Sequence, residues 1–98
     1  MATKFKIFIA DEVYEQLGDI FDYMSNDVAS KKFMANFDKS INFLADFPNM
    51  YPMAGIKNYR KCNVDKYLVF YSVDEENKSV YVLHIYHGAQ DYPKFFKE

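Results

Sequence analysis

The chain has 98 residues, of which 50% are hydrophobic and 19% aromatic, so it carries too much apolar side-chain area for a disordered protein. That length has room for one core, and we expect residues 1–98 to form a single domain. The net charge of −2 disfavours a protein that binds nucleic acid mainly through its phosphates. One Cys and two His exclude an intrachain disulfide and a metal cluster built on these residue types, so no metal and no cofactor is expected.

The first predicted element is a strand at residues 4–10. It alternates polar and apolar residues at first and then becomes apolar, which is typical of a strand that enters a sheet. The apolar part, residues 7–10, is too short for a signal peptide or a membrane span, and acids follow it directly at Asp11 and Glu12. We therefore expect a cytoplasmic protein without a membrane partner.

Two helices are predicted next, and Asp11 has the residue type of a helix N-cap. The first helix carries an apolar stripe with helical spacing, at Val13, Leu17, Ile20, Phe21 and Met24. Residues 25–27 form a polar break with a second cap. The next stripe contains Phe33, Phe37, Ile41 and Leu44, and Pro48 ends that helix. The short break predicts an antiparallel helical hairpin.

Three strands are predicted in the second half of the chain, after a loop at 47–55 that is marked by prolines and a glycine. They span residues 59–64, 67–73 and 79–87, and the last two are rich in aromatic and β-branched residues. The order β-α-α-β-β-β predicts an α+β fold, an antiparallel sheet with the helical hairpin on one face. The other face carries several aromatic residues and is a candidate partner surface.

Charged residues are distributed unevenly along the chain. Acids dominate from Asp11 to Asp27, which is most simply the solvated face of the first helix. Basic residues gather in the middle of the chain, at Lys57, Arg60, Lys61 and Lys66. They suit either phosphate or an acidic partner protein. Strand alternation puts neighbouring residues on opposite faces, so only part of this group is expected to converge.

Four local patterns resemble those of the RelE/ParE toxin superfamily and occur in the same order. They are INFLADFPNMYP at 41–52, YRK at 59–61, YLVFYSVD at 67–74 and VLHIYHGAQD at 82–91. The resemblance covers nearly the whole chain. It implies the toxin component of a type II toxin–antitoxin (plasmid stabilisation) module, neutralised by a cognate antitoxin that wraps the toxin surface.

The resemblance leaves two activities open, because RelE-type members cleave mRNA in the ribosome, whereas ParE-type members inhibit DNA gyrase without a known reaction of their own. RelE-type cleavage uses an arginine directly after the first tyrosine of the third pattern and arginines just beyond the last strand. This chain has Leu68 and Gln90 at such positions. Neither side chain can replace a guanidinium that stabilises developing phosphate charge. Gyrase inhibition is therefore favoured, and whether the chain is an enzyme stays open.

The candidate catalytic residues are His87 and Arg60. An imidazole titrates near physiological pH and can act as general acid or base; the simpler role for His87 is to end the last strand and bond backbone near Gly88. The candidates for binding a substrate or target are Lys57, Lys61, Lys66, Gln90 and Tyr92. His84 is expected to be packed or to face a partner. The alternative function is an inactive toxin-fold module that only binds an antitoxin-like protein.

Overall fold

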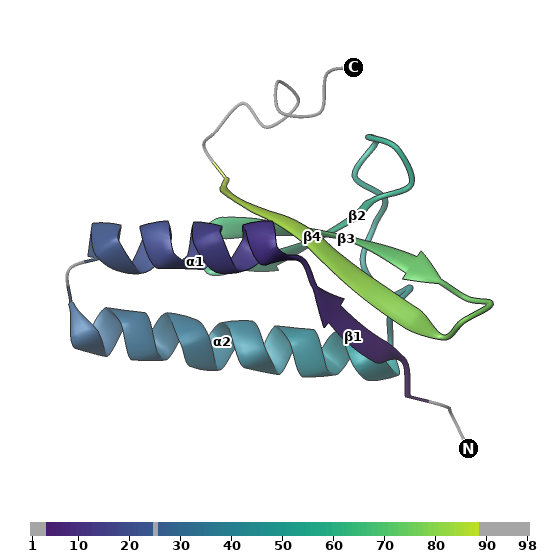
Figure 1. Cartoon of the computed structure of the whole chain (residues 1–98), viewed down its shortest axis with the longest axis horizontal. Helices are drawn as coiled ribbons and strands as arrows, with labels where there is room; N and C mark the ends of the chain where they lie inside the picture. The colour runs from purple at the N-terminus through teal and green to yellow at the C-terminus, as the bar shows by residue number, and fades with distance from the viewer. Residues whose placement is uncertain (1–3, 25, 89–98) are drawn as a thin grey trace.

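Figure 1 shows the computed structural model of the chain, which describes residues 4–24 and 26–88. The elements are β1 (Lys6–Ile9), α1 (Asp11–Met24), α2 (Asp27–Asp46), β2 (Arg60–Val64), β3 (Tyr67–Asp74) and β4 (Ser79–His87). The two helices lie side by side as an antiparallel hairpin on one face of the sheet. The predicted α+β fold with the order β-α-α-β-β-β is confirmed.

The sheet has the strand order β1-β4-β3-β2. Strands β2, β3 and β4 form an antiparallel meander, as predicted, whereas β1 pairs in parallel with β4. This detail differs from the predicted all-antiparallel sheet. A parallel pair needs a long crossover connection, and the helical hairpin together with the first two meander strands supplies it here.

The hairpin forms where the sequence places its caps and stripes. The Asn26 side-chain oxygen accepts hydrogen bonds from the backbone N–H groups of Val28 and Ala29, at 2.9 and 3.2 Å, and so caps α2. Helix α2 ends at Asp46, two residues before Pro48. All four predicted stripe residues of α2 are buried, namely Phe33, Phe37, Ile41 and Leu44. Asp11 lies inside the first turn of α1 and is not the residue before it.

A β-bulge in β4 decides which side chains face the helices. Tyr71 pairs with Val82 and Phe70 pairs with His84, so Leu83 has no partner in β3. Side chains alternate along a strand, and one extra residue reverses the alternation beyond it. Val82 and Ile85 therefore both lie in the core, while His84 lies on the outer face of the sheet. Within the described ranges 4–24 and 26–88, neither helix is long and apolar enough to cross a lipid bilayer.

Gly18 lies in the middle of α1, where glycine weakens a helix by about 1 kcal/mol relative to alanine. A Cβ added there meets nothing within 4 Å, so packing inside the domain does not require glycine. Gly18→Ala is expected to raise the free energy of unfolding by about 0.5–1 kcal/mol in urea titrations. Gly88→Ala is the contrasting variant, because its Cβ would lie 3.2 Å from the Lys66 carbonyl oxygen. A loss of stability in Gly18→Ala would contradict the account.

Candidate target-binding site

The end of β4 at His87 is held in place by the turn between β2 and β3. His87 pairs with Tyr67 across the sheet, and the two rings meet edge to face with centroids 5.3 Å apart. The next backbone N–H, that of Gly88, donates a hydrogen bond of 2.8 Å to the Lys66 carbonyl. This bond involves the backbone of Gly88 and not the side chain of His87. The strand end and the Tyr67 ring together place the imidazole at the end of the sheet.

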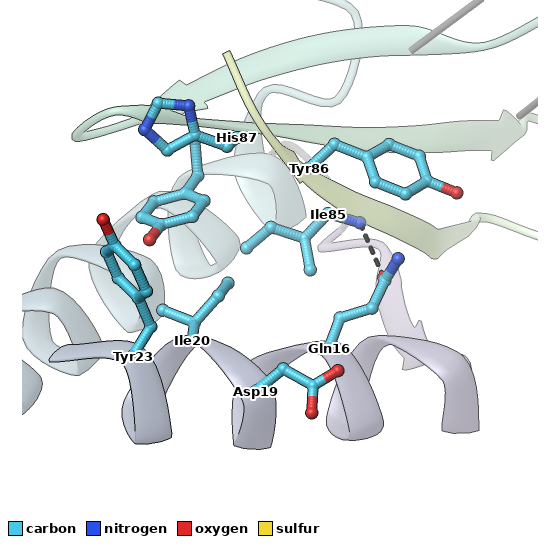
Figure 2. Close-up of a pocket in the computed structure, with 8 residues that line it drawn as sticks. Gln16, Asp19, Ile20, Tyr23, Ile85, Tyr86 and His87 are labelled. Carbon is cyan, nitrogen blue, oxygen red and sulfur yellow. Dashed lines mark hydrogen bonds between the residues drawn. The ribbon is translucent and has the colours of Figure 1, made fainter. Parts of the chain in front are cut away.

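Two adjoining hollows open around His87, and they share Tyr23, Tyr67 and His87. The first, which we call the α1–β4 hollow, has a volume of about 470 Å³ and lies between those two elements (Figure 2). Its α1 wall is formed by Gln16, Asp19, Ile20 and Tyr23, and its β4 wall by residues 85–87. The second hollow, of about 630 Å³, adds Lys32 and Lys66 on the other side of Tyr23.

Two tyrosines of the α1–β4 hollow, Tyr67 and Tyr86, are not activated for chemistry. Burial raises the pKa of the Tyr67 hydroxyl, and the neighbouring Tyr23 adds to the rise. Burial also raises the pKa of Tyr86, and the Glu12 carboxylate adds to it. Both phenols stay protonated at neutral pH and cannot serve as general bases. These residues offer ring surface and hydroxyl hydrogen bonds, which suits binding.

Gln16 occupies the place of a missing strand at the edge of β4. Strand β1 pairs with β4 only as far as Ile9 opposite Val82. Beyond that point the Gln16 side-chain oxygen accepts a 2.9 Å hydrogen bond from the backbone N–H of Ile85 (Figure 2). This contact fixes α1 against β4 and so shapes the hollow between them.

Gln16→Leu is expected to lower the free energy of unfolding by about 1–3 kcal/mol, because the Ile85 N–H loses its acceptor in a partly buried place. Urea titration measures the loss, and amide exchange at Ile85 should become faster. Gln16→Glu retains an acceptor oxygen and should cost less. Equal stability of Gln16→Leu and the unchanged chain would show that this hydrogen bond does not hold α1.

The two candidate catalytic residues are far apart. Arg60 pairs with Tyr71 and His87 pairs with Tyr67, and these two partners are four residues apart along β3. That spacing corresponds to roughly 13 Å of extended strand. The Arg60 guanidinium donates to the Tyr51 carbonyl at 2.6 Å and approaches the Asn49 carbonyl at 3.5 Å. Arg60 thus anchors the loop after α2, at the opposite end of β3 from His87.

The basic candidates are distributed over three places. Lys66 lines the second hollow. Lys61 lies in one cross-strand row with Phe70 and His84, on the outer face. The Lys57 ammonium lies 5.8 Å from the Tyr59 ring centroid. The remaining two candidates, Gln90 and Tyr92, lie outside the described residues.

His84 packs on the outer face of the sheet. Its ring stacks on Tyr86 with centroids 5.8 Å apart and lies 6.0 Å from the Tyr59 ring. The Glu12 carboxylate contacts its Nδ1 atom, so α1 also touches this face. In the part of the chain that the structure describes, no three His, Cys, Asp or Glu side chains come together to form a metal site.

Comparison with known proteins decides the family. The family model of the ParE toxin of the type II toxin–antitoxin system parDE matches residues 7–92, most of the chain. The chain belongs to the ParE toxin family. The predicted RelE/ParE relationship, which rested on four local patterns, is thereby confirmed.

The fold of this ParE-family chain matches a solved structure as well. It aligns with a chain in the crystal structure of the archaeal RelE–RelB complex from Pyrococcus horikoshii OT3, with a TM-score of 0.59 and 16% sequence identity. The match covers 89% of this chain and 98% of that chain. At such low identity it shows a shared fold alone. A search among curated proteins finds no match.

Some residues that shape the site in this ParE-family chain had no signal in the sequence. Gln16 is one polar residue among many on α1, and no local pattern indicates that it bonds β4. Tyr23 is a large aromatic residue close to several acids on the surface of α1, and this was the one available signal. Tyr67 was not among the predicted site residues; it is buried in the core and lines both hollows.

Proposed function

We propose that the chain is the toxin of a type II toxin–antitoxin module and inhibits growth by binding DNA gyrase, without cleaving RNA. The observation that carries the second part of the proposal is the separation of Arg60 from His87. Cleavage of RNA needs a base and a group that stabilises phosphate charge on the same phosphodiester. Arg60 is bonded to loop carbonyls roughly 13 Å along the strand from His87.

The residues around His87 also support binding over cleavage. The RelE-type arginine position holds Leu68, an apolar residue in the same strand as Tyr67. Tyr67 and Tyr86 of the α1–β4 hollow have raised pKa values, so they hold their protons at neutral pH. Binding to a target protein requires only complementary surface, and the hollows supply it.

An antitoxin is the second partner in this proposal. The ParE family model describes toxins of toxin–antitoxin systems, and the fold match is to a chain from a RelE–RelB complex. An antitoxin that binds the folded toxin should stabilise it by mass action, by about 2.7 kcal/mol at a hundredfold excess over Kd. Co-expression of the protein encoded next to this one should restore growth.

Induced expression in a bacterium without the antitoxin tests the target. We expect DNA synthesis, followed by pulse labelling with thymidine, to fall before protein synthesis, followed with methionine. His87→Ala and Arg60→Ala should not abolish the arrest through loss of chemistry, provided that each variant accumulates and folds. An early fall of protein synthesis would instead indicate ribosome-dependent cleavage. Unaffected growth would indicate the inactive binding module.

A further inference from the structure

Helix α1 presents a strongly acidic side next to the α1–β4 hollow. The helix contains five acids and no Lys or Arg, and all five are exposed: Asp11, Glu12, Glu15, Asp19 and Asp22. With 3.6 residues per turn, Glu12 and Asp19 fall in the row of Gln16 and Tyr23, which face the hollow. The other three acids form the adjacent row. The acids therefore lie on one side of the helix and do not surround it; Asp19 lines the hollow, and Glu12 contacts His84 on the outer face of the sheet.

Asp11 and Glu12 lie in the first turn of α1 and suit the helix dipole, but the acids that follow them do not serve the stability of the helix. Asp11 and Glu15, and again Glu15 and Asp19, are like charges four residues apart, a spacing that destabilises a helix. Asp22 lies in the last turns of α1, where the helix dipole favours cations. The repulsion among Asp11, Glu15 and Asp19 would be relieved by a partner with the opposite charge.

The hollow supplies the apolar part of the same surface. Ile20 and Ile85 are 7% and 2% exposed and form its floor, whereas Tyr23 stands at the rim with 84% of its surface exposed. Figure 2 shows the Tyr23 and His87 rings at one end and Asp19 and Gln16 at the other. A large exposed aromatic residue beside an apolar hollow is typical of an anchor in a protein interface.

We propose that the α1–β4 hollow docks a segment of a partner protein that has apolar side chains in its middle and Lys or Arg on the side that meets α1. Phosphate would be repelled by the acids, which argues against nucleic acid. The acidic rows extend along a helix of 14 residues, about 21 Å, which suits a peptide segment better than a small molecule. This proposal concerns a binding surface of the chain, and it does not depend on whether the target of the toxin is gyrase.

Charge also gives the docked segment a direction. Lys32 and Lys66 line the second hollow, beyond Tyr23 and His87, together with a single acid, Asp65, so basic residues outnumber acids there. Cations of the partner are therefore expected along α1 and not at this end. Lys66→Glu should leave the binding of a basic segment unchanged or strengthen it, whereas charge reversal on α1 should weaken it.

The test titrates the purified full chain with a fluorescein-labelled amphipathic helical peptide made of leucine and lysine, and follows fluorescence anisotropy. Two control peptides are a leucine–glutamate peptide with the same pattern and a leucine–lysine peptide of scrambled order. The variants are Tyr23→Ala and the double variant Asp19→Lys with Asp22→Lys. The matched control is Asp38→Lys, an exposed aspartate on α2 away from the hollow. Circular dichroism checks that each variant is folded.

We expect saturable binding of the leucine–lysine peptide that weakens at least tenfold in Tyr23→Ala and in the double variant. Asp38→Lys should change the affinity for the leucine–lysine peptide less than twofold. The two control peptides should bind the unchanged chain at least tenfold more weakly than the leucine–lysine peptide does. Equal weakening by Asp38→Lys would mean diffuse attraction between charges and would overturn the proposal. So would tight binding of the leucine–glutamate peptide, or unchanged binding to the Asp19 and Asp22 double variant. Growth arrest by the Tyr23→Ala chain does not enter this test, so its outcome is separate from that of the proposed function.

Discussion

Phe33→Ala is expected to lower the free energy of unfolding by about 3–5 kcal/mol, which is a large share of the 5–15 kcal/mol typical of such a domain. Phe33 is 1% exposed and joins both helices to the sheet. Its ring meets Phe21 and Tyr67 edge to face, at 6.2 and 5.2 Å, and lies 6.3 Å from Phe37. Truncation would leave a cavity beneath Tyr67, the residue that lines both hollows.

Urea titration followed by circular dichroism measures this loss. Phe33→Leu fills more of the space and should cost less than Phe33→Ala. Phe8→Ala is the exposed control, because Phe8 is 47% exposed on β1 and stacks on Tyr81 outside the core. If Phe33→Ala were no more costly than Phe8→Ala, the assignment of the core would be wrong.

Tyr71→Phe is expected to lower the free energy of unfolding by about 1–3 kcal/mol at pH 7. The buried Tyr71 hydroxyl donates a 2.9 Å hydrogen bond to the Pro48 carbonyl. The neighbouring Arg60 holds the Tyr51 carbonyl of the same loop. Without the hydroxyl, the Pro48 carbonyl remains buried without this donor. Tyr14→Phe is the control, because Tyr14 is 59% exposed, and it should stay within about 0.5 kcal/mol of the unchanged chain.

The same variant has a distinctive pH dependence. Burial raises the pKa of Tyr71 well above that of an ordinary tyrosine. The unfolded chain therefore loses this proton as the pH rises through about 10, while the folded chain keeps it, and the fold is destabilised above that pH. Tyr71→Phe has no such hydroxyl to titrate. The difference in free energy of unfolding between the unchanged chain and Tyr71→Phe should therefore narrow by about 1 kcal/mol from pH 7 to pH 10.5. A constant difference would contradict the buried state of the hydroxyl.

Local patterns predicted the parts of the fold that depend on local sequence. The α2 stripe of Phe33, Phe37, Ile41 and Leu44 is buried as a unit because helical spacing puts these residues on one face. The predicted bounds of β4, residues 79–87, agree with the structure. The parallel pairing of β1 with β4 was not predicted, because it joins segments about 70 residues apart. A short stretch of sequence does not indicate which distant strand it will pair with.

The arrangement of the candidate site depended on such long-range contacts. Local sequence placed His87 at a strand end and put Arg60 and Lys61 on opposite faces, but it gave no distance between His87 and Arg60. That distance follows from the strand register, which pairs Arg60 with Tyr71 and His87 with Tyr67. The bond from Ile85 to Gln16 spans 69 residues and has no local signature. From the sequence alone, the acids of α1 are most simply the solvated face of the helix. Only the structure shows that Asp19 lies beside the hollow, which adds the interpretation as a surface for a basic partner.

The most direct test of the central claim is a DNA supercoiling assay with purified gyrase and the purified full chain. We predict that the chain inhibits supercoiling in a concentration-dependent way and that the cognate antitoxin reverses the inhibition. If supercoiling is not inhibited by a chain that still arrests growth, gyrase is not the target. That result would contradict the claim and would favour the ribosome as the target.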